Sequence, residues 1–422
     1  MRSSDSGTVH IVGAGLAGLA AAVSLSGSAR KIVVHEATLQ PGGRCRSFQD
    51  AATGMLIDNG THLLLSGNSA ALSYAATIGS RSELIGPAEA EFSFVDIADG
   101  ARWTVQFSGG RIPWWVFDKD RRVPQTSIAD YLALAPLIWT KGDKPLGTVM
   151  NCAGPLFDRF IEPILLAALN ISPRDGSSKL ATALLRETIV MGGKACRPLL
   201  ARDGIGKVFI EPALRYLRSR ATISLQDELR AIEFSSGSAT RLDFTTGSIV
   251  LGDGDAVVLA VPPYIATALL PGLQVPTQFR GIVNAHFRAD PPNQTPAMLG
   301  VLNGTCEWIF AKPGHISVTV SDASRLFDMP KAELAQQIWN EVAAISGLSR
   351  DLPPWQLVRE RRATFAATPE QNALRPGPET PWRNVYLAGD WTATDLPATI
   401  EGAVRSGYRA ADMVSRALQE AA

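Results

Sequence analysis

The feature that most restricts the fold is a glycine-rich turn near the start of the chain, within "TVHIVGAGLAGLAAAVSLSG". "TVHIV" is typical of a buried parallel strand, and the Ala/Leu-rich run behind it is typical of a helix. Gly13 allows the tight turn, Gly15 lets the backbone approach a pyrophosphate, and Gly18 lets the helix pack closely on the strand. The stretch therefore predicts a dinucleotide site whose turn consists of Gly13, Ala14, Gly15, Leu16, Ala17 and Gly18.

The next apolar run, "KIVVHE", ends in Glu36, which Ala37 follows. A carboxylate at the end of this second strand accepts hydrogen bonds from the ribose hydroxyls of an adenosine and repels a 2′-phosphate. FAD and NAD therefore fit the pattern, whereas NADP does not. A glycine turn without a ligand is the alternative, and the joint presence of strand, helix and acid argues against it.

Two further stretches favour FAD over NAD. "ATLQPGGRCRSF" contains a glycine pair and a cation that can lie against a pyrophosphate or the edge of a flavin. "MLIDNGTHLLL" places a polar turn after a strand, where the backbone can approach a flat ring. The residues of these stretches expected at the cofactor are Gly42, Gly43, Arg44, Gly60, Thr61 and His62.

The C-terminal stretch "VYLAGDWTATDLPATIEGAVRSGYRAA" supplies the third element of a flavin site. A strand leads into Gly389 and Asp390, and Asp390 can bond the ribityl chain. A helix is expected to begin near Pro397, Ala398 and Thr399, and unpaired N–H groups at that start can hold the flavin carbonyl at O2. Thr399 and Ile400 are therefore expected at the cofactor.

Composition excludes several classes of protein. Forty basic and forty acidic residues leave no net charge, so no overall field favours a nucleic-acid partner. The four cysteines form no CxxC pair, and the five histidines show no ligand spacing, so we expect no metal site. The first residues do not read as a signal peptide and no run of 18 apolar residues occurs, which predicts a cytoplasmic protein.

These stretches resemble the flavin amine oxidase and phytoene desaturase superfamily over the whole chain. "DNGTHLLLSGN", "RRATFAATPEQNALRPGP" and "AGDWTATDLPATIEGAVRSGYRAA" are more specifically similar to the bacterial hydroxysqualene dehydroxylases. That family usually reads Thr-Gly-Leu-Pro-Ala-Thr where this chain has Asp395 in place of the glycine, which puts the local loop conformation in doubt.

The resemblance implies an α/β fold: a Rossmann-like FAD-binding domain of the GR2 type with an interleaved α+β substrate domain. The FAD-binding domain is expected to consist of residues 1–85, 203–265 and 384–422, and the substrate domain of residues 86–202 and 266–383. Within "ATISLQDELRAIEF", which reads as two short strands, the resemblance places Leu229 against the adenine through its backbone. "FIEPILLAALN" and "LALAPLIW" are too short to span a bilayer, so we expect core helices there, with the lining of an apolar tunnel as the alternative.

The resemblance also implies a reaction of squalene and hopanoid biosynthesis, in which reduced flavin delivers hydride to hydroxysqualene and squalene results. A carotenoid desaturase is the main alternative. An amine oxidase is disfavoured because the turn before the last helix lacks an aromatic residue, and the complete cofactor set argues against a prenyl-binding module without flavin. His62 is the one candidate for catalysis, although a histidine there can simply satisfy backbone groups. The sequence identifies neither the proton donor nor the external electron donor.

The segment "RIPWWVFDKDRR" combines Trp114, Trp115 and Phe117 with four cations. Aromatic side chains interleaved with cations suit a membrane surface, and they also suit a partly buried edge. A long isoprenoid substrate makes contact with the inner face of the cytoplasmic membrane a hypothesis to test, with both tryptophans near the entrance.

Overall fold

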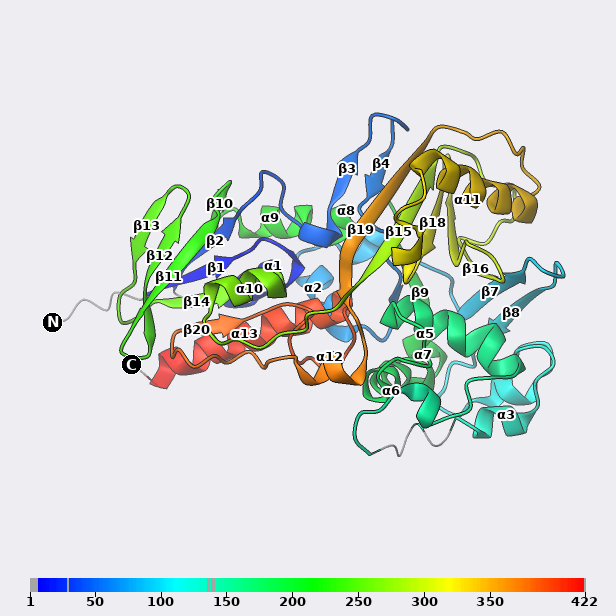
Figure 1. The fold of residues 1–422 in the computed structure, drawn as a ribbon, viewed down its shortest axis with the longest axis horizontal. Coiled ribbons are helices and arrows are strands. Elements are labelled where there is room, and N and C mark those ends of the chain that lie inside the picture. The colour runs from blue at the N-terminus through cyan, green and yellow to red at the C-terminus, as the bar shows by residue number, and fades with distance from the viewer. Residues whose placement is uncertain (1–6, 29, 135–136, 138–140, 421–422) are drawn as a thin grey trace.

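The computed structural model describes residues 7–28, 30–134, 137 and 141–420. The chain forms two parts that lie side by side along the longest axis, and both described ends lie in the same part (Figure 1). The expected helix in "LALAPLIW" lies partly outside the described residues, and its first residue, Leu132, is exposed. "FIEPILLAALN" is helical as expected, with Leu165 and Leu169 buried.

A five-stranded parallel sheet forms the centre of the first part, in the order β10-β2-β1-β14-β20. Its strands are Thr222–Leu225, Lys31–Glu36, Thr8–Val12, Ala256–Leu259 and Val385–Leu387. The interiors of these strands are apolar and buried, as a parallel sheet covered on both faces requires. Helices α1 (Leu16–Leu25) and α13 (Ile400–Glu420) pack against each other although they come from opposite ends of the chain (Figure 1).

A seven-stranded sheet dominates the second part, in the order β19-β15-β18-β17-β16-β7-β8. Its strands are Trp355–Phe365, Phe279–Phe287, His315–Val320, Trp308–Lys312, Met298–Leu302, Glu91–Asp96 and Arg102–Gln106. Neighbouring strands are antiparallel except β16 and β7. Helix α11 (Lys331–Ser346) contributes Leu334, Ile338 and Val342 to a core shared with this sheet.

Smaller elements complete the two parts. A second helical layer of the second part consists of α3 (Ile128–Leu132), α5 (Glu162–Leu169), α6 (Ser178–Glu187) and α7 (Gly193–Cys196). The remaining helices are α2 (Ser69–Thr77), α8 (Ile205–Phe209), α9 (Glu211–Leu217), α10 (Pro263–Leu269) and α12 (Pro369–Ala373). The remaining strands are β3 (Ser47–Gln49), β4 (Leu56–Asp58), β5 (Leu64–Leu65), β6 (Leu84–Ile85), β9 (Pro198–Ala201), β11 (Leu229–Ser235), β12 (Ser238–Phe244) and β13 (Gly247–Val250).

This architecture confirms the predicted fold class. The parallel sheet has the strand–turn–helix unit expected of a Rossmann-like domain, and the second part mixes antiparallel strands with helices. The two expected strands of "ATISLQDELRAIEF" are β10 and β11, and Leu229 is the buried first residue of β11.

Candidate functional site

Three of the residues expected at the cofactor lie at the carboxyl edge of the parallel sheet. Gly13 follows β1, Glu36 ends β2, and Gly389 comes two residues after the last residue of β20. Parallel strands bring their carboxyl ends to one edge, and ligands of open α/β sheets bind in the crevice outside that edge. Segments from both ends of the chain therefore converge on one site.

The glycines of the first turn have the properties that a pyrophosphate cradle needs. Gly13 adopts φ +106°, a left-handed conformation that favours glycine. A Cβ atom on Gly18 would lie 2.0 Å from the carbonyl oxygen of Gly13, so only glycine permits this approach of helix and turn. A Cβ atom on Gly15 would meet no protein atom within 4 Å. The turn is thus crowded on the protein side and open at Gly15, where a ligand could approach.

Glu36 is held directly beside this turn. Its Oε2 accepts a hydrogen bond from the backbone N–H of Ala14 at 2.9 Å, and its Oε1 accepts from the N–H of Thr38 at 2.9 Å. The backbone N–H of Gly42 donates to the carbonyl of Ala14 at 2.9 Å, which joins the second glycine pair to the first turn. Three segments expected at the adenosine and pyrophosphate therefore lie in hydrogen-bonded contact.

Arg44 and Asp390, 346 residues apart, form an ion pair in this site. Arg44 Nη2 lies 2.6 Å from Asp390 Oδ1, and Arg44 Nη1 donates to the carbonyl of Ala363 at 2.5 Å. The Asp390 side chain is almost fully buried, whereas that of Arg44 is 43% exposed. The pair leaves one side of the guanidinium open to a phosphate or flavin edge.

The turn at residues 60–62 is fixed by the seven-stranded sheet. The N–H of Thr61 donates to Asn284 Oδ1 at 3.2 Å, and Thr61 Oγ1 lies 3.0 Å from Ser317 Oγ. His62 Nδ1 lies 2.6 Å from the carbonyl oxygen of Gly60, so Nδ1 carries the proton that is donated. Burial lowers the pKa of His62 below its ordinary value. The neutral imidazole therefore predominates at neutral pH, and one of its nitrogens is already used within the turn.

The C-terminal helix begins at Ile400, directly after the predicted start near Pro397, Ala398 and Thr399. Thr399 Oγ1 accepts a hydrogen bond from the N–H of Gly402 at 3.1 Å, and α13 starts at Ile400. The N–H of Gly389 donates to Ser406 Oγ at 2.8 Å, which ties the Gly389–Asp390 turn to the same helix. These contacts keep the first turn of α13 beside the Asp390 loop.

Arg375, which sequence reasoning missed, organises that loop. The side chain is buried, and its Nη2 lies 3.0, 2.5 and 3.0 Å from the carbonyls of Asp390 and Thr392 and from Thr394 Oγ1. Its Nη1 donates to Asn372 Oδ1 at 3.1 Å. Since an arginine in "ALRPGP" carries no local pattern of its own, only the fold reveals this role.

Two other missed residues lie against the predicted turns. Asn284 bonds Thr61 as described, and Glu360 of β19 accepts from Asn59 Nδ2 at 3.4 Å. Both belong to long strands of the second part, and the alternation of side chains along those strands does not distinguish them from ordinary sheet residues.

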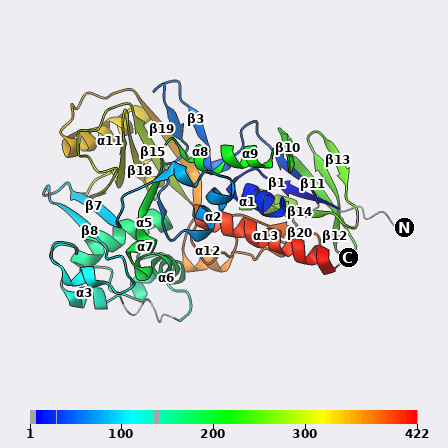
Figure 2. The ribbon, with the colours of Figure 1, turned by 180° about the vertical axis from the view of Figure 1, so that it is seen from behind.

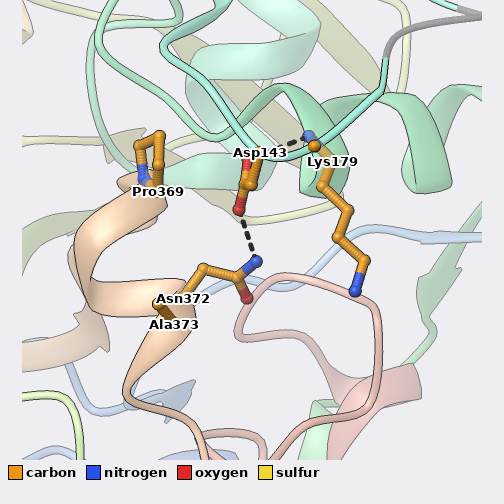
Figure 3. Close-up of a pocket in the computed structure, with 6 residues that line it drawn as sticks. Asp143, Lys179, Pro369, Asn372 and Ala373 are labelled. Atoms are coloured by element: carbon orange, nitrogen blue, oxygen red, sulfur yellow. Dashed lines mark hydrogen bonds between the residues drawn. The ribbon is translucent and has the colours of Figure 1, made fainter.

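Asn372, which bonds Arg375, also lines a surface pocket. Its lining consists of Gly142, Asp143, Lys179, Pro369, Asn372 and Ala373 (Figure 3). Asp143 Oδ2 accepts from Asn372 Nδ2 at 2.7 Å (Figure 3), so Asn372 connects this pocket to Arg375.

Lys179, which also lines the pocket, reaches Asp395, and the distance between Lys179 Nζ and Asp395 Oδ1 is 3.2 Å. Asp395 adopts φ +65°, so the loop keeps a backbone conformation that suits the glycine typical of the family.

The residues fit FAD. The open face at Gly15, the carboxylate beside the glycine turn and the Arg44–Asp390 pair lie along one edge of the sheet. They would hold the pyrophosphate, the adenosine ribose and the ribityl end, respectively.

Comparisons with known proteins agree with this geometry. A model of the family "Flavin containing amine oxidoreductase" matches residues 16–415. Hydroxysqualene dehydroxylase of Rhodopseudomonas palustris is 56% identical over 409 residues, which cover 96% of this chain and 98% of that protein. The enzyme of the same name from Sinorhizobium fredii is 55% identical over 406 residues, covering 96% and 97% of the two chains.

More distant similarities follow the same fold. A probable zeta-carotene desaturase of Synechococcus elongatus is 22% identical over 473 aligned positions, covering 96% of this chain and 97% of that protein. The solved structure of cyclohexylamine oxidase from Brevibacterium oxydans superposes with a TM-score of 0.73 at 16% identity, covering 98% of this chain and 100% of that one. The protein is thus an FAD-dependent oxidoreductase. The chain belongs to the flavin-containing amine oxidoreductases and, among them, to the family of the hydroxysqualene dehydroxylases.

Proposed function

We propose that this protein removes the hydroxyl group of hydroxysqualene reductively and releases squalene, as a step of squalene and hopanoid biosynthesis. The observation that carries the proposal is the full-length identity of 55–56% to two hydroxysqualene dehydroxylases. We call the carboxyl edge of the parallel sheet, with its glycine turn, Glu36 and the Arg44–Asp390 pair, the cofactor edge. Its residues support the proposal, because they suit FAD.

The reaction consumes two electrons and two protons. The carbon–oxygen bond breaks, the oxygen leaves as water after protonation, and a new carbon–hydrogen bond forms on the same carbon. Bound reduced FAD supplies the hydride. The chain must hold the cofactor, exclude water that would capture an allylic cation, and deliver the remaining proton. An electron donor outside this chain must restore the reduced flavin.

The cofactor residues proposed for this task are those that the sequence predicts. Support comes from their convergence at one sheet edge and from the contacts of Glu36, Arg44 and the 60–62 turn. His62 is a poor proton donor in its neutral form, so its proposed part is to shape the turn through Gly60. The proton donor stays unassigned.

We also propose the domain division expected from the sequence. All five strands of the parallel sheet come from residues 1–85, 203–265 and 384–422. All seven strands of the second sheet come from residues 86–202 and 266–383. Strand β9 (198–201) pairs with β5 and β6, so this short sheet joins segments from both proposed domains.

Cytoplasmic location with peripheral membrane contact completes the proposal. No helix within the described part of the chain is both long and apolar enough to cross a bilayer. A long isoprenoid substrate dissolves in lipid far better than in water, which favours an enzyme that works at the membrane surface.

A carotenoid desaturase is the second candidate, since a zeta-carotene desaturase is a distant relative. The two reactions need opposite starting states, because a desaturase releases electrons to the flavin. The test is anaerobic: dithionite-reduced enzyme is mixed with hydroxysqualene, and the flavin spectrum and products are followed. Oxidised flavin and squalene should appear in equal amounts, and oxidised enzyme should not react. Reduced enzyme that stays reduced, together with oxidised enzyme that bleaches with a polyene, would establish the desaturase instead.

A further inference from the structure

Three short segments of the second part expose a group of large apolar side chains. These segments are the 3₁₀ helix Trp114–Phe117 with the loop before it, α3, and the 3₁₀ helix Ile189–Met191. Trp114 is 63% exposed and Leu132 is 69% exposed. We call the group the apolar platform, and its members are Ile112, Trp114, Phe117, Ile128, Leu132, Val190 and Met191.

Contacts between the three segments bring the apolar platform into one region of the molecule. The ring of Trp115 is buried and meets the ring of Tyr131 edge-on at 5.3 Å, which joins the first 3₁₀ helix to α3. The N–H of Gly193 donates to the carbonyl of Ser108 at 2.9 Å, and Ser108 Oγ donates to the carbonyl of Ile112 at 3.1 Å. Of the two tryptophans expected near the entrance, Trp114 is exposed, whereas Trp115 is buried and anchors the element that presents Trp114.

Charges around the apolar platform suit an anionic surface. Residues 108–132 and 189–194 carry five cations against three carboxylates. The cations are Arg111, Lys119, Arg121, Arg122 and Lys194, and the carboxylates are Asp118, Asp120 and Asp130. Asp130 is already committed to the N–H and hydroxyl of Ser127, at 2.6 and 2.8 Å. Arg121 Nη2 lies 3.4 Å from Glu89 Oε2, which pairs this cation. Arg111, Lys119 and Lys194 are exposed, as are Asp118 and Asp120.

The position of the apolar platform in the molecule is also suitable. Helix α3 lies at the end of the molecule opposite the two termini in both views (Figure 1 and Figure 2). A flat surface could therefore meet this end without touching the parallel sheet that carries the cofactor residues.

We propose that the apolar platform docks onto a lipid bilayer with anionic headgroups. The proposal rests on the proposed function in one respect, since a substrate dissolved in lipid gives the docking its purpose. Tryptophan and phenylalanine at the tip of an element, flanked by arginine and lysine, match the composition of the membrane interface. Seven apolar residues are few for a stable protein–protein interface, which uses roughly 20–30 residues on each side. A membrane needs no matching shape and accepts such a small patch.

Vesicle flotation of the FAD-loaded full chain tests the docking. The parent should float with vesicles of phosphatidylcholine and phosphatidylglycerol, and less with phosphatidylcholine alone. The double variant Trp114→Ser, Leu132→Ser should bind at least about tenfold more weakly, because it removes two large exposed apolar side chains. The matched control is Leu39→Ser, Val250→Ser, two side chains that are 70% and 78% exposed outside the apolar platform. It should float like the parent.

Three results would overturn the proposal: a parent that does not float, platform and control variants that float equally, or a platform variant that converts a parent dimer into a monomer by light scattering. The last result would assign the surface to a second copy of the chain. Thermal melting verifies that each variant is folded. Squalene formation from detergent-dispersed hydroxysqualene should be unchanged in the platform variant, whereas formation from vesicles should fall about tenfold. If the parent floats with vesicles but forms no squalene in detergent, the proposed function is contradicted and the docking proposal is not.

Discussion

The cofactor edge and the apolar platform are built in opposite ways. At the cofactor edge, the first backbone turn is determined by a few neighbouring residues, as the close approach of Gly18 to Gly13 shows. In the apolar platform, Trp114, Leu132 and Met191 come from three segments that meet only in the folded chain. A local sequence motif therefore predicts where the cofactor binds, whereas the apolar platform depends on the tertiary packing of three segments.

The largest effects are expected from substitutions in the first glycine turn, which test whether neighbouring residues alone determine its conformation. Gly18→Ala forces a Cβ atom to 2.0 Å from the Gly13 carbonyl oxygen, so both the melting temperature and FAD binding should fall, the latter by roughly a hundredfold or more. Gly15→Ala meets no protein atom within 4 Å, so the apoprotein should melt like the parent while FAD binds about tenfold to a hundredfold more weakly. Gly27→Ala, exposed and equally free of contacts, serves as the control. An unchanged FAD affinity in Gly15→Ala would contradict the assignment of the pyrophosphate to that turn.

Arg375 tests whether the cofactor edge also depends on long-range contacts. Arg375→Met leaves the buried carbonyls of Asp390 and Thr392 without their donor, at a cost of about 3 kcal/mol, and FAD retention should weaken with stability. Arg375→Lys should lie between this variant and the parent. Arg409→Met is the matched control, because Arg409 donates to the carbonyl of Ala393 in the same loop but is largely exposed. Calorimetry and FAD titration measure both quantities, and equal losses in the two Met variants would contradict the special role of Arg375.

Each part of the molecule contains a close histidine pair, His10 with His35 and His286 with His315. The pH dependence of stability can therefore be compared between the two parts. Burial, together with the neighbouring His35 and His315, lowers the pKa of His10 to about 4 and that of His286 to about 3. The folded state then binds fewer protons than the unfolded state below the ordinary value near 6.5. Stability should therefore be lost as pH falls from 6.5 toward 4, by about 2 kcal/mol per such histidine at pH 5.

The two pairs can be separated by substitution. His10→Asn and His286→Gln should each reduce the drop in melting temperature between pH 7 and pH 5, whatever their effect at pH 7. If one variant flattens the profile and the other does not, acid unfolding starts in the part that holds the effective pair. A drop identical to that of the parent in both variants would contradict the assignment.

Asp395 gives the smallest expected effect. Its φ of +65° costs a side chain on the order of 1 kcal/mol, and its exposed ion pairs with Lys179 and Arg409 return a similar amount. Asp395→Gly should therefore change stability by less than about 1 kcal/mol. Asp395→Ala keeps the unfavourable φ and loses the ion pairs, so it should melt below both. An alanine variant as stable as the glycine variant would show that the backbone conformation is not costly here.

Sequence reasoning succeeds where one residue's role depends on its chain neighbours. The strands around Gly13 and the helix after Thr399 are such cases, because glycine spacing and apolar runs determine them. It does not identify Arg375 or Asn284, because the loop carbonyls that Arg375 holds and the turn that Asn284 holds lie 15 or more residues away. The sequence also does not show which of Trp114 and Trp115 is buried, because the burial of Trp115 depends on Tyr131 and Phe107, outside its own segment.

The parallel sheet also has a consequence for biosynthesis of the protein. Strand β20 and helix α13 belong to the last 38 residues, yet α13 packs on α1 and Gly389 is bonded to Ser406. A ribosome that adds about 5–20 residues per second needs roughly 20–80 s for a chain of 422 residues. Throughout that time the N-terminal glycine turn exists without its C-terminal partners. FAD capture should therefore wait until residues 385–422 have been synthesised, and a nascent chain stalled before residue 385 should remain colourless.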